Sequence, residues 1–235
     1  MLYCYKLGGF APAGATRAFR KETHAHRGRC AGSRTARVSA LDLRSEVLLM
    51  FGGEGGEKQR IRMETKQVSM NLDPAYRAEA SRSITKQVLD LPEWRNAETV
   101  MAYVSMAEEP DTKELIRAAL DEGKTLLLPR CVDRSTMVAL PVSDPDTLEK
   151  GILGIPEPPA AEGPEVPEPD LILVPCMCAT PNGIRLGHGA GYYDRFLAGQ
   201  KGMTVCLCFS RLLRSDLPAE ATDIPVDRVI TDEGD

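Results

Sequence analysis

The chain has 235 residues, 43% of them hydrophobic and 27% charged, with a formal net charge of −5. This length fits one large domain or two small ones, and the composition argues against a disordered, fibrous or membrane-embedded protein. No apolar run reaches the roughly 20 residues that span a bilayer, so no membrane segment is expected. The acidic body has no basic stripe and aromatic residues make up 5% of the chain, so nucleic acid binding is not expected either.

Residues 1–57 differ in charge from the rest of the chain. They hold nine Lys and Arg against five Asp and Glu, whereas residues 58–235 hold 20 and 29. Because the first segment is rich in Arg, Gly, Ala and Ser and lacks apolar periodicity, we expect a poorly ordered extension before one folded domain, 58–235. The extension resembles an organellar transit peptide, although paired glycines interrupt any long amphipathic helix. The alternatives are a dispensable tail, or a true start near Met50 or Met63.

Two helices are predicted from their end signals. Asp73 and Pro74 are typical of an N-cap and first helical position, and the apolar spacing that follows predicts a helix over 74–90, ended by Pro92. Farther along, Asp111 and Glu114 have the spacing of a capping box and predict a second helix, which Gly123 ends.

Short apolar runs of strand length alternate with these helices. They predict strands at residues 99–105, 125–129, 136–142, 171–175, 203–209 and 228–231. Between the third and fourth runs, residues 151–169 hold six prolines after residue 155 and predict a stiff, extended loop. Continuous apolar strands alternating with helices indicate an α/β fold with a mainly parallel sheet covered on both faces. In such sheets, ligands bind where the strands end.

The segment GIRLGHGAGYYDRFL, residues 183–197, contains the clearest binding motif. Alternating glycines before a predicted helix let the backbone approach an anion closely, and the free N–H groups at the helix start attract phosphate. Arg185 adds a fixed positive charge, and Asp194 falls in the first helical turn, where a carboxylate can hold Mg²⁺ against phosphates. The spacing matches neither of the two common nucleotide-binding glycine motifs, so on this basis alone the loop is either a nucleotide site or a structural turn.

The same segment resembles the signature of the 5-formyltetrahydrofolate cyclo-ligase family, also called methenyltetrahydrofolate synthetases. The likeness covers residues 58–233 and includes, in matching order and spacing, LPEW (91–94), SMAEEPDT (105–112), LPR (128–130), GIPEP (154–158), DLILVP (170–175) and IPVD (224–227). The resemblance implies a three-layer, mainly parallel α/β fold of the NagB/RpiA/CoA transferase type. It also implies conversion of 5-formyltetrahydrofolate to 5,10-methenyltetrahydrofolate with ATP and Mg²⁺, in a catalytic domain that is expected to be monomeric.

The resemblance also implies roles for individual residues. Lys58 and Arg62 match nucleotide-phosphate ligands, and Arg185 and Asp194 match the residues expected to be catalytic. The residues that match the ATP loop are Arg185, Leu186, Gly187, His188, Gly189, Ala190, Gly191, Tyr192 and Tyr193. The Mg²⁺ carboxylates would be Asp194 and Asp227, and the folate contacts would be Val104 and Glu109. The Glu109 carboxylate suits the adjacent N–H donors of a pterin.

Each of these residues also has a structural interpretation. Lys58 and Arg62 could form a solvated helix face, Glu109 could share the capping role of its neighbours, and Asp227 follows a proline turn, where Asp is common. We expect His188 to be a loop side chain that tunes nucleotide contact. Two rival functions stay open: a sugar-phosphate isomerase or CoA transferase that holds a phosphate ester in the loop, and a non-catalytic relative.

The seven cysteines form an odd-numbered set that predicts no disulfide framework and a cytoplasmic location. Cys176 with Cys178, and Cys206 with Cys208, could suggest a four-thiolate zinc site. However, residues two apart on a strand share a face, whereas zinc knuckles usually need two intervening residues on a turn. We therefore expect these thiols to pack in the core.

Overall fold

The computed structural model describes residues 54–151, 153–160 and 166–234, all within one compact unit, Leu41–Asp235. The disorder expected for residues 1–57 falls almost entirely outside the described residues, as do residues 152 and 161–165 of the proline-rich loop. No helix in the described part of the chain is long and apolar enough to cross a membrane.

A six-stranded sheet forms the centre of this unit, as the sequence predicts, in the order β10-β9-β6-β1-β2-β3. Five strands are parallel and the edge strand β3 is antiparallel to β2. The strands are β1 (Thr99–Met101), β2 (Thr125–Cys131), β3 (Met137–Pro141), β6 (Leu171–Val174), β9 (Met203–Leu207) and β10 (Arg228–Ile230). The central strand β6 is fully buried along its length because both faces of the sheet are covered.

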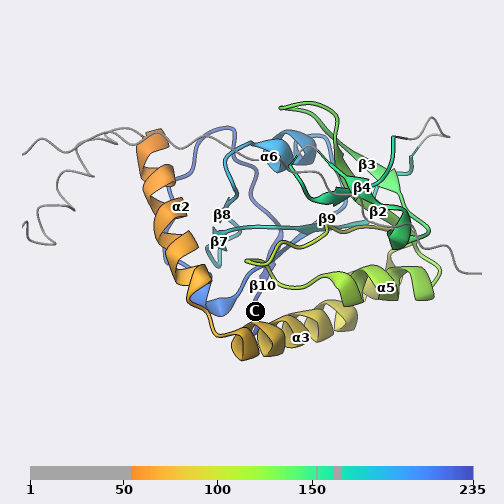
Figure 1. Ribbon diagram of the computed structural model, residues 1–235, viewed down its shortest axis with the longest axis horizontal. Helices are drawn as coiled ribbons and strands as arrows, with labels where there is room; N and C mark the ends of the chain where they lie inside the picture. The colour runs from red at the N-terminus through yellow and green to blue at the C-terminus, as the bar shows by residue number, and fades with distance from the viewer. Residues whose placement is uncertain (1–53, 152, 161–165, 235) are drawn as a thin grey trace, which may run out of the picture. The chain divides into compact units, whose positions relative to one another are not determined.

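Helices flank the sheet on both sides. In Figure 1, α3 (Pro74–Asp90) and α5 (Lys113–Asp121) lie on one side, and the short α6 (Tyr192–Leu197) lies on the other. The predicted bounds of α3 are confirmed, and the Asp73 carboxylate accepts a hydrogen bond from Ala75 N at 2.7 Å. Pro92 does more than end α3, since it also begins a further helix, α4 (Pro92–Asn96), which buries Trp94.

The segment between β1 and α5 differs from the prediction. The strand ends at Met101 rather than at residue 105, and the capping box of Asp111 is wrong, because Thr112 is the N-cap of α5. The Thr112 hydroxyl makes no cap bond: it donates to the Tyr103 carbonyl at 2.5 Å and so ties the chain after β1 to the start of α5. Local spacing does not reveal this long-range contact, which creates a loop at the carboxyl end of β1.

Two small hairpins and one long helix complete the surroundings of the site. The proline-rich segment is not simply extended, because β5 (Pro156–Glu157) pairs with β4 (Glu149–Lys150). The chain after β6 forms β7 (Cys178–Ala179) and β8 (Arg185–Leu186) before it reaches α6. The first described helix, α2 (Glu54–Met70), carries Lys58 and Arg62 one turn apart. Short 3₁₀ turns lie at Pro145–Thr147 and Ser210–Leu212.

Gly183, at the tip of the β7–β8 hairpin, permits a close backbone approach. Its φ is +86°, and a Cβ there would lie 2.2 Å from the Val226 carbonyl oxygen. We expect Gly183→Ala to lower the free energy of unfolding by about 2 kcal/mol or more, since both the backbone conformation and the contact disfavour a side chain. Urea denaturation measures this, with Gly199→Ala as a control in open space. Equal stability of the two variants would contradict the expectation.

Candidate active site

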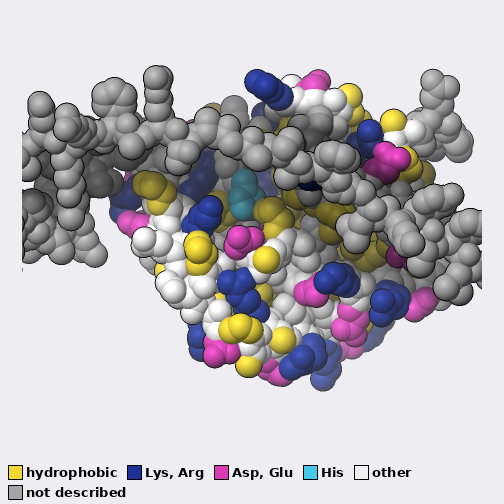
Figure 2. Space-filling model, viewed as in Figure 1, with side chains coloured by type: hydrophobic (Ala, Val, Ile, Leu, Met, Phe, Trp, Pro, Cys, Tyr) yellow, Lys and Arg dark blue, Asp and Glu magenta, His cyan; other side chains and the backbone are white. Residues whose placement is uncertain are grey.

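A cavity of about 830 Å³ opens at the carboxyl edge of the parallel strands, where the topology predicts a ligand site. Its walls come from α2, the loop after β1, the end of β2, the β4–β5 hairpin, the segment from β8 to α6, and the loop before β10. On the face shown in Figure 2, basic, hydrophobic and histidine side chains gather side by side. The cavity lining includes Lys58 and Arg185 as well as Val104 and Ile155, so it offers both charge and apolar surface to a ligand.

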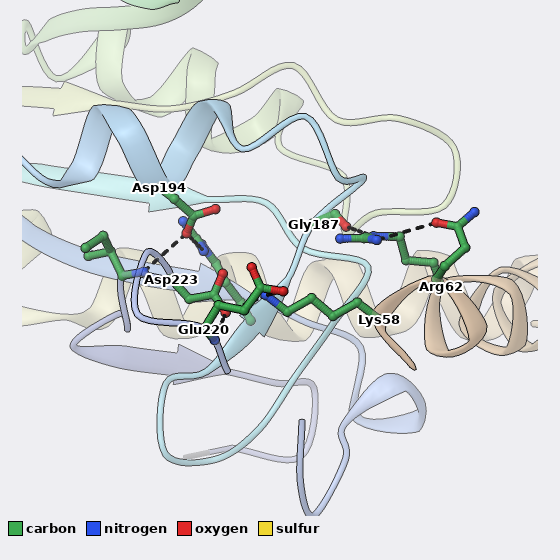
Figure 3. A network of polar contacts seen from close by, with 9 residues as sticks. Lys58, Arg62, Gly187, Asp194, Glu220 and Asp223 are labelled. Carbon is green, nitrogen blue, oxygen red and sulfur yellow. Dashed lines mark hydrogen bonds and ion pairs between the residues drawn. The ribbon is translucent and has the colours of Figure 1, made fainter. Parts of the chain in front are cut away.

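Two cations project from α2 into this cavity (Figure 3). The Lys58 ammonium lies 2.7 Å from Asp223 and 3.2 Å from Glu220, and the Arg62 Nε donates to the Gly187 carbonyl at 2.9 Å. Lys58 is buried, which argues against the solvated-face interpretation. The structure thus brings both residues to the glycine loop, 125 positions away in the case of Arg62.

The Lys58–Asp223 pair makes stability depend on pH. Burial opposes ionisation of Asp223, but the Glu220 N–H and the Lys58 charge outweigh it, so the Asp223 pKa lies below its ordinary value of 3.8. A lowered pKa adds stability above the unfolded value, and that stability is lost as pH falls through the folded value. In denaturation from pH 7 to pH 3, we expect Asp223→Asn to be less stable than the wild type by about 1–2 kcal/mol near neutrality. The gap should close on acidification, and a constant gap would contradict this account.

Arg185 is the most buried cation of the site, with a side chain only 4% exposed. Its Nη1 donates to the Asp194 carboxylate at 2.9 Å, and the same carboxylate accepts from Ile224 N at 3.2 Å. The other guanidinium nitrogens, Nε and Nη2, are buried without a hydrogen-bond partner among the described residues. A guanidinium left unpaired in a cavity wall is suited to an anionic ligand, because N–H groups of this kind pair in bidentate fashion with phosphate.

The glycine loop supports this cation cluster through its backbone. Gly189 has a φ of +101°, and a Cβ there would lie 3.2 Å from the Arg62 guanidinium carbon. Gly191, at a φ of +67°, is the N-cap of α6, and the Ala190 carbonyl accepts from Arg195 at 2.6 Å. Because α6 has only six residues, its dipole contributes little. The positive potential expected of the helix start therefore comes mainly from the arginine and lysine side chains.

Glu109 lies in the wall of the same cavity with its side chain 4% exposed. One carboxylate oxygen accepts from Met106 N at 2.8 Å, and the other lies 3.6 Å from the half-exposed His188 Nε2. Glu109 has no capping role, since it precedes the first residue of α5 by four positions. His188, which we expect to tune nucleotide contact, also lines the cavity and faces this carboxylate. Val104 lines the cavity nearby, as do Leu186, Tyr192 and Tyr193.

Sequence reasoning missed a second buried acid in the cavity. Glu157, on β5, is 5% exposed and accepts from Cys131 N at 3.2 Å. Burial and the Glu157 charge raise the pKa of the Cys131 thiol to about 11, so it stays protonated. Gly151 makes room for Glu157, because a Cβ at 151 would lie 2.0 Å from the carboxylate carbon. The only sequence signal was the GIPEP segment itself.

Asp227 does not join the cavity. It lies just before β10, at the amino edge of the sheet, and its carboxylate accepts from both N and Oγ1 of Thr204 at the start of β9. The acid that does reach the site from this segment is Asp223, whose neighbour Glu220 also lines the cavity. The structure therefore places Asp194 and Asp227 apart. Asp227 instead joins the start of β10 to β9 through its hydrogen bonds with Thr204.

The cysteines on and after the central strands pack as expected. Cys176, Cys178, Cys206 and Cys208 are all buried and free. Within the described residues, no group of three or more His, Cys, Asp or Glu side chains is arranged to hold a metal ion.

Comparison with known proteins identifies the family of the chain. The sequence profile of the 5-formyltetrahydrofolate cyclo-ligase family matches residues 54–232. The chain belongs to this family. A 5-formyltetrahydrofolate cyclo-ligase of Saccharomyces cerevisiae is 30% identical over 206 residues, covering 75% of this chain and 96% of the relative. A protein from Schizosaccharomyces pombe described as a probable 5-formyltetrahydrofolate cyclo-ligase is 30% identical over 172 residues, covering 65% and 84%.

Solved structures agree with this assignment. The NMR structure of 5,10-methenyltetrahydrofolate synthetase from Aquifex aeolicus is 32% identical, with a TM-score of 0.67, over 75% of this chain and 90% of that chain. A synthetase from Mycoplasma pneumoniae shares the fold at 17% identity, with a TM-score of 0.59. The cyclo-ligase match includes Lys58, Arg62 and the whole glycine loop. It gives no support to the isomerase or CoA transferase alternative.

Cyclo-ligases are ATP-dependent enzymes, so the fit of Mg²⁺ to this cavity matters. Mg²⁺ is usually bound through one or two carboxylates together with substrate phosphates. Asp194 supplies one carboxylate in the cavity wall, beside the unpaired guanidinium nitrogens of Arg185. The described residues provide no ready-made metal cage. This arrangement fits a Mg²⁺ ion that is held jointly by Asp194 and a bound nucleotide.

Proposed function

We propose that this protein converts 5-formyltetrahydrofolate and ATP to 5,10-methenyltetrahydrofolate, ADP and phosphate. The observation that carries the proposal is the Arg185 guanidinium, buried in the cavity wall with two nitrogens unpaired among the described residues. The same cavity holds the buried Glu109 carboxylate, suited to pterin N–H groups. One cavity thus offers a phosphate site and a heterocycle site, as a reaction between a nucleotide and a folate requires.

In the proposed reaction, the formyl oxygen attacks the terminal phosphorus of ATP and ADP leaves. The neighbouring N10 then attacks the activated carbon, its proton departs, and the oxygen leaves as phosphate. Phosphoryl transfer needs positioning and charge neutralisation more than a protein nucleophile. Arg185, Lys58 and Arg62 supply this positive charge in the cavity wall. Mg²⁺, when bound at Asp194, would neutralise further phosphate charge.

In the proposed reaction, Lys58 exchanges its carboxylate partners for a phosphate group of the nucleotide. Without ligand, its ammonium is paired with Asp223 and Glu220, and these hydrogen bonds and charges outweigh the opposing effect of burial, so its pKa is raised. Lys58 therefore remains charged at neutral pH. A nucleotide phosphate would compete with the two carboxylates for the same cation. Release from Glu220 costs little, because the Glu220 side chain is 39% exposed and its pairing is screened by water, whereas release from Asp223, which is 18% exposed, costs more.

The test is formation of the methenyl product, followed by its near-ultraviolet absorbance, from the full chain with 5-formyltetrahydrofolate, ATP and Mg²⁺. We expect turnover that needs both ATP and Mg²⁺ and that falls about 100-fold in Asp194→Asn. Asp216→Asn serves as the control, because Asp216 lies outside the cavity wall. The absence of product from folded wild-type protein would overturn the proposal and favour a non-catalytic member of the family.

A further inference from the structure

Tyr103 has a buried hydroxyl that no described residue satisfies. The residue follows β1, is 3% exposed and lines the cavity, and its OH has no hydrogen-bond partner within the described ranges. The Tyr103 backbone is held firmly, since its carbonyl accepts the Thr112 hydroxyl at 2.5 Å. The backbone is therefore anchored and the ring is buried, while the hydroxyl has no hydrogen-bond partner among the described residues.

Two other tyrosines in the described chain use their hydroxyls. Tyr76 bonds to both oxygens of Asp232 at 3.1 Å, and Tyr192 donates to the Asp133 carbonyl at 2.8 Å. An unpaired buried hydroxyl is unfavourable, whereas phenylalanine fills the same space without that cost. A tyrosine at this position is thus explained if a ligand supplies the missing partner.

The Glu109 carboxylate is a charged neighbour of Tyr103, and it limits which chemical groups a ligand can present at this place. Burial first, and then the Glu109 charge, raise the pKa of Tyr103 well above its ordinary value, and both also raise that of Tyr193, whose hydroxyl is likewise unpaired among the described residues. Both hydroxyls therefore stay protonated and can donate at any pH at which the protein works. The Glu109 carboxylate can only accept hydrogen bonds, whereas the two tyrosine hydroxyls can donate them. Together these groups suit a ligand edge that carries hydrogen-bond donors next to an acceptor.

We propose that the Tyr103 hydroxyl binds the pterin ring of the folate substrate, donating to its ring carbonyl while Glu109 accepts from the adjacent N–H groups. This inference rests on the proposed function. A lactam edge of a pterin presents donors and an acceptor side by side, which matches a carboxylate next to a hydroxyl. Tyr103 is then a substrate-binding residue that positions the formyl group relative to the phosphate site.

Tyr103→Phe tests the proposal, because it removes only the hydroxyl. We expect the Kd for 5-formyltetrahydrofolate, measured by calorimetry without ATP, to rise about 3- to 10-fold. The KM for folate should rise similarly, the KM for ATP should not change, and the melting temperature should stay equal or increase. Tyr76→Phe is the matched control, since it loses hydrogen bonds to Asp232, and neither Tyr76 nor Asp232 lines the cavity. That variant should melt lower and bind folate as the wild type does.

Each outcome decides a different point. Unchanged folate binding in Tyr103→Phe, with an active wild type, would overturn the role of Tyr103 and leave the proposed function standing. A lower melting temperature in Tyr103→Phe would show a structural bond and would also overturn it. Wild-type protein that neither binds nor converts 5-formyltetrahydrofolate would overturn the proposed function and this inference together.

Discussion

Replacement of Arg185 by leucine is expected to lower kcat/KM by about 1,000-fold. Arg185 is the buried cation whose Nε and Nη2 are free of partners among the described residues, so it is placed to neutralise charge that develops on a transferring phosphoryl group. Steady-state kinetics on the methenyl product measure the loss. Arg185→Lys should retain part of the activity, since it keeps a charge but loses the planar set of donors.

Two controls separate this effect from misfolding. Arg185→Leu also leaves Asp194 without its 2.9 Å partner, so circular dichroism and a melting curve must accompany the kinetics. Arg82→Leu removes an exposed arginine that, among the described residues, is paired with Glu79 on the same helix, and it should change neither activity nor fold. If folded Arg185→Leu kept activity within about tenfold of wild type, the phosphate role of Arg185 would be refuted.

Glu109→Gln is expected to raise the KM for 5-formyltetrahydrofolate by about 10- to 100-fold and to leave the KM for ATP within about twofold. The substitution keeps the size of the side chain and a carbonyl that can accept from Met106 N, but it removes the charge and places an amide donor before the pterin N–H groups. Kinetics with each substrate varied in turn distinguish the two KM values.

The neighbouring Glu108→Gln is the matched control. Glu108 does not line the cavity, so its neutralisation should leave both KM values unchanged. If Glu109→Gln raised the KM for ATP alone, Glu109 would bind the nucleotide. The assignment of Glu109 to the pterin ring of the folate would then be wrong.

The sequence predicted the elements of the fold whose causes are local. The helix Pro74–Asp90 and its Asp73 cap follow from the side chains at its own ends, and the continuous apolar runs predicted buried parallel strands because neither face could meet water. Predictions were wrong where contacts with residues distant in the sequence determine the local structure. Asp111 is not the N-cap of α5, because that position falls to Thr112, whose hydroxyl bonds to Tyr103, and Pro156 and Glu157 pair with β4 instead of remaining in an extended loop.

For the site, the sequence identified the residue types and the glycine loop, and the resemblance to a family indicated most of the positions. Lys58, Arg62, Glu109, Arg185 and Asp194 all line one cavity. The position of Asp227 shows the limit of this approach. Asp223 and Asp227 lie four positions apart, and only the path of the chain across the sheet puts the first at the cavity and the second beside Thr204.

The sequence by itself thus determined the α/β class, the buried strands and the cationic loop, because these depend on periodicity and on neighbouring residues. Only the tertiary structure decided which groups meet. It paired Lys58 with Asp223 across 165 positions, placed His188 against Glu109, and left the hydroxyl of Tyr103 without a partner among the described residues. The physical reason is that burial and hydrogen bonding depend on the surroundings in space, and these form only when distant segments pack together.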